Sequence, residues 1–180
     1  MTLVEALLAV TLATLCSSAL VTVVTQSVQT TDDAVYTQLA SGLADQLLEE
    51  LASVRFPQAD STRPPATGNR MAFDDLDDYH GWSARPPRNR AGLPPGTDGP
   101  SGTAVSRPQS HRPSPLWLSR LTQEVTVERL QEDGTGQWAV VSQHTPLRRV
   151  TVRISRTDAQ GVTRVLCERI QIFTQVAAAP

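Results

Sequence analysis

The sequence predicts an α+β fold, in which one long N-terminal helix packs on a C-terminal antiparallel sheet of about four strands. Three observations support this prediction. An apolar and then amphipathic segment runs without proline from the first residues to Pro57. A stretch rich in Pro and Gly follows over residues 57–117. Beyond it, short runs alternate between apolar and polar residues and are separated by turn residues, as in antiparallel strands.

The first segment is apolar and long enough to cross a membrane. Residues 2–24 contain one charged residue, Glu5, and a spanning helix needs about 20 mostly apolar residues. A carboxylate in hydrocarbon costs at least ~2.5 kcal/mol, so Glu5 requires a cationic partner. All 16 basic residues are arginines and the first is Arg55. The cation within reach is therefore a terminal amine, from this chain or from a neighbouring copy.

The apolar pattern continues beyond Val24 along one face of a helix. Its residues recur at near-helical spacing, as Val28, Val35, Leu39, Leu43, Leu47, Leu51 and Val54. Pro57 is a stop signal, so we expect one nearly continuous helix over about residues 2–54. Residues 1–27 would form its hydrophobic half, and residues 28–56 an amphipathic half that covers the sheet.

The remaining chain divides into loops and sheet. Residues 57–117 are expected to form surface loops, because their proline-rich tracts are incompatible with regular helix or central strand. Residues 118–176 are expected to form an antiparallel meander with strands at 121–130, 137–143, 147–156 and 162–173. In the third strand, Val150, Val152 and Ile154 should face the helix, and the intervening Arg149, Thr151 and Arg153 should face away.

The N-terminal motif resembles that of a known family. Met1-Thr-Leu-Val-Glu5 followed by an apolar helix is similar to the mature N-terminus of type IV pilins and of type II secretion pseudopilins. The resemblance implies that a leader has been cleaved before Met1, that Met1 is N-methylated, and that Glu5 pairs with the terminal amine of a neighbouring subunit. A secretory signal peptide is disfavoured because no basic residue precedes the apolar run. A plain membrane anchor explains the length but not Glu5.

A second informative segment is Phe73–Trp82, which holds four aspartates within five residues, Asp74–Asp78. Such a cluster suits a hard cation such as Ca²⁺, but its spacing does not match an EF-hand loop. We favour a loop whose Phe73, Leu76, Tyr79 and Trp82 enter the helix–sheet junction while the acids face water. The string is also similar to one in minor pilins of the mannose-sensitive haemagglutinin pilus type.

The sequence provides no pattern for catalysis. It contains no phosphate-binding loop, Gly-x-Ser-x-Gly or zinc signature, so neither an enzyme, a cofactor nor a metal site is expected. The three histidines lack metal-ligand spacing and are expected at the surface: His80, His111 and His144.

Cys16 and Cys167 should lie too far apart for a disulfide. The net charge of −2 gives no electrostatic case for nucleic acid. Residues 101–114 suit either O-linked sugar or a plain solvated loop.

The resemblance implies a structural subunit of an extracellular type IV pilus-like filament that polymerises through its N-terminal helix. Its implied partners are further copies of itself, other pilins, the prepilin peptidase and the inner-membrane assembly machinery. The subunit would lie in the inner membrane before assembly and at the cell surface afterwards. Two alternatives stay open: a minor pilin or pseudopilin at the tip or initiation complex of a pilus or secretion system, and a membrane-anchored adhesion module that does not polymerise.

Overall fold

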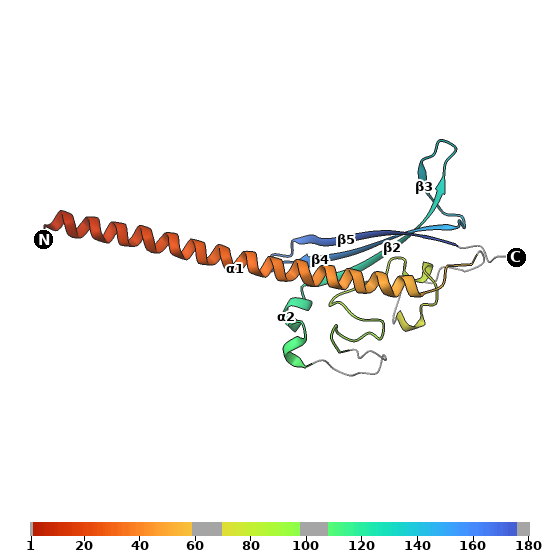
Figure 1. Ribbon diagram of the computed structural model, residues 1–180, viewed down its shortest axis with the longest axis horizontal. Coiled ribbons are helices and arrows are strands. Elements are labelled where there is room, and N and C mark those ends of the chain that lie inside the picture. The colour runs from red at the N-terminus through yellow and green to blue at the C-terminus, as the bar shows by residue number, and fades with distance from the viewer. Residues whose placement is uncertain (1, 59–69, 98–107, 176–180) are drawn as a thin grey trace. The chain divides into compact units, whose positions relative to one another are not determined.

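The computed structural model describes residues 2–58, 70–97 and 108–175 (Figure 1). The chain forms two compact units, Met1–Gln38 and Leu39–Pro180, and each is described by itself. We call the second unit the head. Met1 and residues 101–107 lie outside the described residues, so N-methylation at Met1 and sugar on that stretch stay predictions.

The first element, α1 (Leu3–Ser53), is one α-helix, which confirms the helix predicted over about residues 2–54. Because no proline precedes Pro57, the backbone hydrogen-bond ladder is never interrupted. In the first unit, every side chain from residue 2 to residue 34 is exposed.

Within the head, residues 39–53 of α1 present an apolar stripe to the core. Leu43, Leu47 and Leu51 are buried, as the helical spacing predicts. Ala40 and Ala44 are fully buried on the same stripe, and such small side chains allow close packing. The predicted stripe begins too early, however, because Val28 is 58% exposed. Within the head, burial therefore confirms the prediction from Leu39 onward, because Leu39 and Val54 at the ends of the stripe are half-buried.

The head contains an antiparallel sheet of five strands rather than four. The strands are β1 (Ser83–Ala84), β2 (Leu121–Glu132), β3 (Trp138–Val141), β4 (Leu147–Thr157) and β5 (Thr163–Thr174). As predicted, Val150, Val152 and Ile154 are fully buried on one face of β4. Val125 and Val127 of β2 extend the same apolar face, and Figure 1 shows α1 running along β4 and β5 in the head. The predicted α+β fold is thus confirmed.

The strand order differs from the predicted meander. β2 pairs with β4 along residues 121–129, whereas β3 pairs only with residues 129–132 of β2. Because Arg129 has partners in both β3 and β4, these two strands lie on opposite sides of β2. Between β3 and β4 the chain therefore passes from one side of β2 to the other. A meander would need the whole of one β2 edge for β3, but β1 already occupies part of that edge.

The described parts of the loop region hold only short elements, in line with the prediction. They are η1 (Arg70–Ala72), η2 (Asp77–Tyr79), the two-residue β1, η3 (Gln109–His111) and the single-turn helix α2 (Pro115–Leu118). The prediction of no helix is wrong at α2. Pro115 occupies its first turn, where a missing N–H breaks no hydrogen bond.

Candidate functional site

Glu5 closes the first turn of α1 through a reciprocal pair of contacts with Thr2. The Glu5 backbone N–H donates to Thr2 Oγ1 at 3.4 Å, and the Thr2 backbone N–H donates to Glu5 Oε2 at 3.3 Å. This is a capping box, in which each side chain accepts from the backbone N–H of the other residue. The Glu5 N–H also donates to the Thr2 carbonyl oxygen at 3.1 Å. Thr-x-x-Glu at a helix start is the sequence signature of this cap, so the capping box was predictable from the sequence although it was not predicted.

The remaining polar side chains of the apolar segment are turned back onto the helix. Six hydroxyl groups donate to backbone carbonyl oxygens three or four residues earlier, at 2.8–2.9 Å: Thr11, Thr14, Ser17, Ser18, Thr22 and Thr25. Each hydroxyl is thereby satisfied without water. Within residues 2–25, the surface of α1 is therefore apolar except for the single carboxylate of Glu5.

These properties suit a surface that contacts lipid or other helices. Residues 3–24 extend about 33 Å at the helical rise, and a bilayer hydrocarbon core is about 30 Å thick. The helix is long and apolar enough to span a membrane. In a medium without water, satisfied hydroxyl groups cost little, whereas an unpaired carboxylate remains expensive. Among the polar side chains of this segment, the Glu5 carboxylate therefore has the largest free-energy cost of leaving water without a partner.

In the head, the segment Phe73–Trp82 inserts its apolar side chains into the core. Phe73, Leu76, Tyr79 and Trp82 are all buried, which confirms this part of the favoured prediction. The rings of Phe73 and Tyr79 meet edge to face, with centroids 4.9 Å apart. We call this segment the plug, because it fills the core with side chains from a loop.

The acids of the plug do not all face water, and this corrects the prediction. Asp74 is exposed and Asp75 half-buried, but Asp77 and Asp78 are buried. Asp77 Oδ1 accepts from Arg148 Nε at 2.7 Å, and Asp77 Oδ2 accepts from Arg129 Nη2 at 2.6 Å. Two arginines on adjacent strands thus hold one buried carboxylate.

Electrostatics favour the ionised form of Asp77. Burial alone would raise the pKa of Asp77, but the hydrogen bonds and positive charges of Arg148 and Arg129 outweigh burial and lower that pKa below its ordinary value. Arg148 is fully buried and also donates through Nη1 to the carbonyl oxygen of Thr145 at 2.6 Å. The sequence analysis did not identify Arg148, although it alternates in phase with Val150 on the face predicted to be apolar.

A second polar cluster joins the plug to the end of α1. Tyr79 Oη donates to Glu50 Oε1 at 2.9 Å, and Arg70 Nη2 donates to Glu50 Oε2 at 3.0 Å. Burial, reinforced by the negative charge of Glu50, raises the pKa of Tyr79, so its hydroxyl stays a donor. The Arg70 guanidinium lies 4.2 Å from the centre of the Trp82 ring, within cation–π range.

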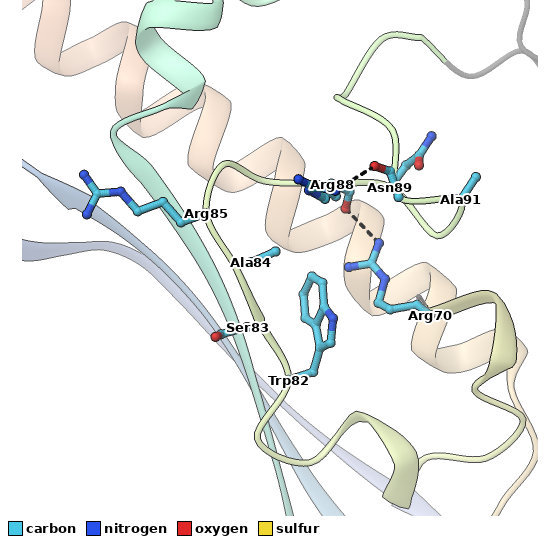
Figure 2. A pocket seen from close by; sticks show the side chains of 9 residues that line it. Arg70, Trp82, Ser83, Ala84, Arg85, Arg88, Asn89 and Ala91 are labelled. Carbon is cyan, nitrogen blue, oxygen red and sulfur yellow. Dashed lines mark hydrogen bonds between the residues drawn. The ribbon is translucent and has the colours of Figure 1, made fainter. Parts of the chain in front are cut away.

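Beside this cluster the head has a pocket of about 610 Å³ (Figure 2). Its lining comes from η1, from the last residue of the plug, from β1 and from the loop that follows β1: Arg70, Trp82, Ser83, Ala84, Arg85, Arg88, Asn89, Ala91 and Gly92. Figure 2 shows Trp82 and the Arg70 guanidinium side by side, with the hydrogen bond from Arg70 to the Arg88 carbonyl oxygen above them. Three of the lining residues are themselves buried, namely Arg70, Trp82 and Asn89.

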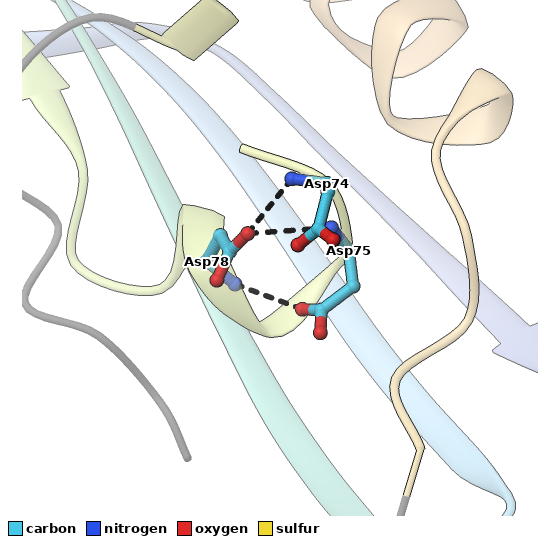
Figure 3. Close-up of side chains that lie close together, drawn as sticks. All are labelled: Asp74, Asp75 and Asp78. Atoms are coloured by element: carbon cyan, nitrogen blue, oxygen red, sulfur yellow. Dashed lines mark hydrogen bonds between the residues drawn. The ribbon is translucent and has the colours of Figure 1, made fainter. Parts of the chain in front are cut away.

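The remaining aspartates of the plug form a compact group (Figure 3). One oxygen from each of Asp74, Asp75 and Asp78 lies within 4.8 Å of the others, as in a cation site. However, one oxygen of Asp75 and one of Asp78 already accept hydrogen bonds from the backbone. Asp78 Oδ2 accepts from the backbone N–H groups of residues 74 and 75, and Asp75 Oδ1 accepts from those of residues 77 and 78. These bonds shape the turn, so the group has a structural role without an ion. Burial, and then the charge of Asp78, raise the pKa of Asp75.

The plug also completes an edge of the sheet. Between β1 and β3, the backbone N–H of Val125 donates to the carbonyl oxygen of Trp82 at 2.9 Å, and that of Val127 donates to His80 Nδ1 at 3.2 Å. His80 is therefore not the simple surface residue that was predicted. His144 is likewise half-buried, with its Nδ1 3.4 Å from Arg148 Nη2, whereas His111 is exposed as predicted.

The cysteines agree with the prediction of no disulfide. Cys16 is an exposed free thiol in the first unit, and Cys167 is a buried free thiol in β5.

Comparisons with known proteins do not place the chain: no family model, no curated protein and no solved structure matches it significantly.

Proposed function

We propose that this chain is a structural subunit of a type IV pilus-like filament and polymerises through the first half of α1. The observation that carries the proposal is the exposed apolar surface of residues 2–25, on which Glu5 is the one charged group. Such a surface stays dry if the helix passes from lipid into a bundle of identical helices. The partners follow from the same resemblance: other copies, other pilins, a prepilin peptidase and the inner-membrane assembly machinery.

Glu5 supplies the specificity of that bundle in this proposal. Its carboxylate would meet the terminal amine of an adjacent subunit, because a paired charge in a low-dielectric core costs far less than a lone one. The capping box already gives Glu5 Oε2 a donor from its own chain. A neutral backbone N–H does not neutralise the charge, however, so an amine from a neighbour still adds stabilisation.

The capping box also favours one second candidate, a membrane-anchored head that does not polymerise. In that case the role of Glu5 is to satisfy the first turn of α1, and no second copy is needed. A minor subunit would assemble through the same helix contacts as the filament subunit. It differs only in its position, which is the tip or the initiation complex. A polymerising subunit and a non-polymerising anchored head therefore make different predictions for Glu5 variants.

The test compares sheared surface filaments with membrane-bound subunit in cells that express Glu5→Gln or Glu5→Ala. Loss of the carboxylate leaves the neighbouring amine unpaired, which costs at least ~2.5 kcal/mol, or about a 70-fold loss in the assembly equilibrium. We expect normal subunit in the membrane and few filaments. Asp32→Asn is the matched control, because it removes an exposed carboxylate from the same helix outside the apolar segment.

Thr2→Ala separates the charge from the cap. It removes the Oγ1 acceptor of the capping box but leaves the Glu5 carboxylate available to an amine. Because losing such a cap costs about 1 kcal/mol, filament yield should fall much less than in Glu5→Ala. Equal losses in the two variants would favour the capping role, and full filament yield from Glu5→Ala would contradict the polymerisation proposal.

A further inference from the structure

The floor of the head pocket carries a buried cation with unsatisfied donors. Arg70 is 3% exposed, and its Nη2 donates to Glu50 Oε2 at 3.0 Å and to the Arg88 carbonyl oxygen at 2.8 Å. Its Nε and Nη1 are buried and have no acceptor among the residues that the structure describes. A buried donor without a partner destabilises the fold, and the effect is larger when the donor is charged. An acceptor placed in the pocket would remove that destabilisation.

The electrostatics of the lining favour a negatively charged acceptor. Three of the nine lining residues are arginines, at positions 70, 85 and 88, and none is acidic. Glu50 balances one of these charges from behind Arg70. Arg85 turns away, with its Nε donating to the Ser119 carbonyl oxygen at 3.1 Å, so it contributes only its field. Arg88 is exposed at the rim, where its Nη1 donates to the Gly92 carbonyl oxygen at 3.4 Å, a long contact that an anion can replace.

The position of Arg70 is set by the surrounding structure. Its guanidinium lies against the Trp82 ring on one side, and Glu50 and the Arg88 backbone hold Nη2. Figure 2 shows the guanidinium between Trp82 and Arg88, among the residues that line the pocket. A donor held in place before binding loses little conformational entropy when a ligand arrives.

We propose that this pocket binds a small oxyanion, with Arg70 Nε and Nη1 as donors on its floor and Arg88 as the cation at its rim. The volume of about 610 Å³ accommodates a small organic acid or a phosphate ester as well as a free ion. The shared chemistry is a carboxylate or phosphate group with several acceptor oxygens. This site is independent of α1 assembly, because all its residues belong to the head.

The experiment titrates the full-length chain, in a non-ionic detergent at low ionic strength, by calorimetry. The probes are sodium glucuronate, sodium phosphate and neutral glucose, each up to about 10 mM, where a ligand of millimolar affinity is mostly bound. Glucuronate and phosphate are expected to bind, and glucose is not. The tighter of the two anions identifies the source of the oxyanion as an acidic sugar or as phosphate.

Three variants connect binding to the pocket. Arg88→Gln is expected to weaken anion binding at least about tenfold, because it removes a charge-assisted contact. Ala84→Leu fills the pocket without changing its charge and is expected to abolish binding. Arg164→Gln is the matched control, because it removes an exposed arginine from β5, outside the pocket, and should leave affinity unchanged.

Folding is checked by near-ultraviolet circular dichroism of each variant, so that loss of binding is not confused with loss of structure. The proposal is overturned if neither anion binds the wild-type chain, which would mean that water satisfies Arg70. It is also overturned if Arg88→Gln and Arg164→Gln weaken binding equally, because this would indicate a general charge effect. A third overturning result is that Ala84→Leu binds the anions as tightly as the wild-type chain does.

Discussion

Asp77→Asn removes one negative charge from the interior of the head while preserving the shape of the side chain. Asp77 is 1% exposed and Arg148 is 0% exposed, and 2.7 Å separates Asp77 Oδ1 from Arg148 Nε. Without the carboxylate, Arg148 is a buried charge whose described neighbours are neutral: backbone carbonyls, the Thr145 hydroxyl and the His144 ring. Breaking a buried pair in this way costs about 3–5 kcal/mol. Because Asn retains one acceptor oxygen, we expect the lower end of that range.

The free energy of unfolding is measured by urea titration of the full-length chain in detergent, with tryptophan fluorescence as the probe. Of the three tryptophans, Trp82 is buried and Trp138 is exposed, so Trp82 should change its emission more on unfolding than Trp138. Asp74→Asn is the control. Its ion pair with Arg55, at 3.3 Å, lies at the surface, with both side chains more than two-thirds exposed, so its loss should cost less than about 1 kcal/mol. A double variant, Asp77→Leu with Arg148→Met, removes the two fully buried charges and should be more stable than Asp77→Asn alone. Arg129 remains, but its side chain is 18% exposed and it still donates to the Ser142 carbonyl oxygen.

The same ion pairs determine how stability depends on pH. The pKa of Asp77 in the folded head lies below its ordinary value, so around pH 4 the unfolded chain binds more protons than the folded one. The contribution of Asp77 is therefore fully present above the unfolded value of about 3.9, and it is lost as pH falls through the lower folded value. Asp77→Asn should lack this component of acid unfolding. The reasoning is refuted if Asp77→Asn is as stable as Asp74→Asn, or if wild type and Asp77→Asn lose stability identically below pH 4.

Three further changes test other parts of the head. Gly42→Ala should stabilise it by about 0.5–1 kcal/mol in urea titration, because Gly42 is helical and an added Cβ meets no atom within 4 Å; destabilisation would mean that the helix packs more tightly there. Tyr79→Phe should cost about 1–2 kcal/mol in the same assay, since Glu50 loses a buried donor, and an unchanged midpoint would show that the bond contributes nothing. Millimolar Ca²⁺ should leave the thermal midpoint unchanged relative to chelator, because oxygens of Asp75 and Asp78 already accept backbone hydrogen bonds; a clear rise would identify a cation site.

Local patterns in the sequence were sufficient to predict α1, the strand positions and the burial of the plug. Helical spacing and two-residue alternation are properties of neighbouring residues, and hydrophobic burial acts on them whatever the topology. Leu43, Leu47 and Leu51 therefore lie where the spacing predicts, and so do Val150, Val152 and Ile154. The Thr2–Glu5 capping box was equally predictable from the sequence, because it depends on residues three apart.

Tertiary structure alone decided which polar groups meet. Arg148 and Asp77 are 71 residues apart in the sequence. The alternation in β4 assigns the Arg148 position to the buried face, but it does not indicate that a carboxylate lies beside it. The crossing of the chain from β3 to β4 likewise depends on β1 and His80, which occupy the β2 edge from a distant loop. Long-range charge pairs and strand order depend on the closure of long loops around a shared core, and no local spacing encodes them. The apolar length of the first segment is a property of the sequence, whereas the buried cations of the head and its pocket exist only once the chain has folded.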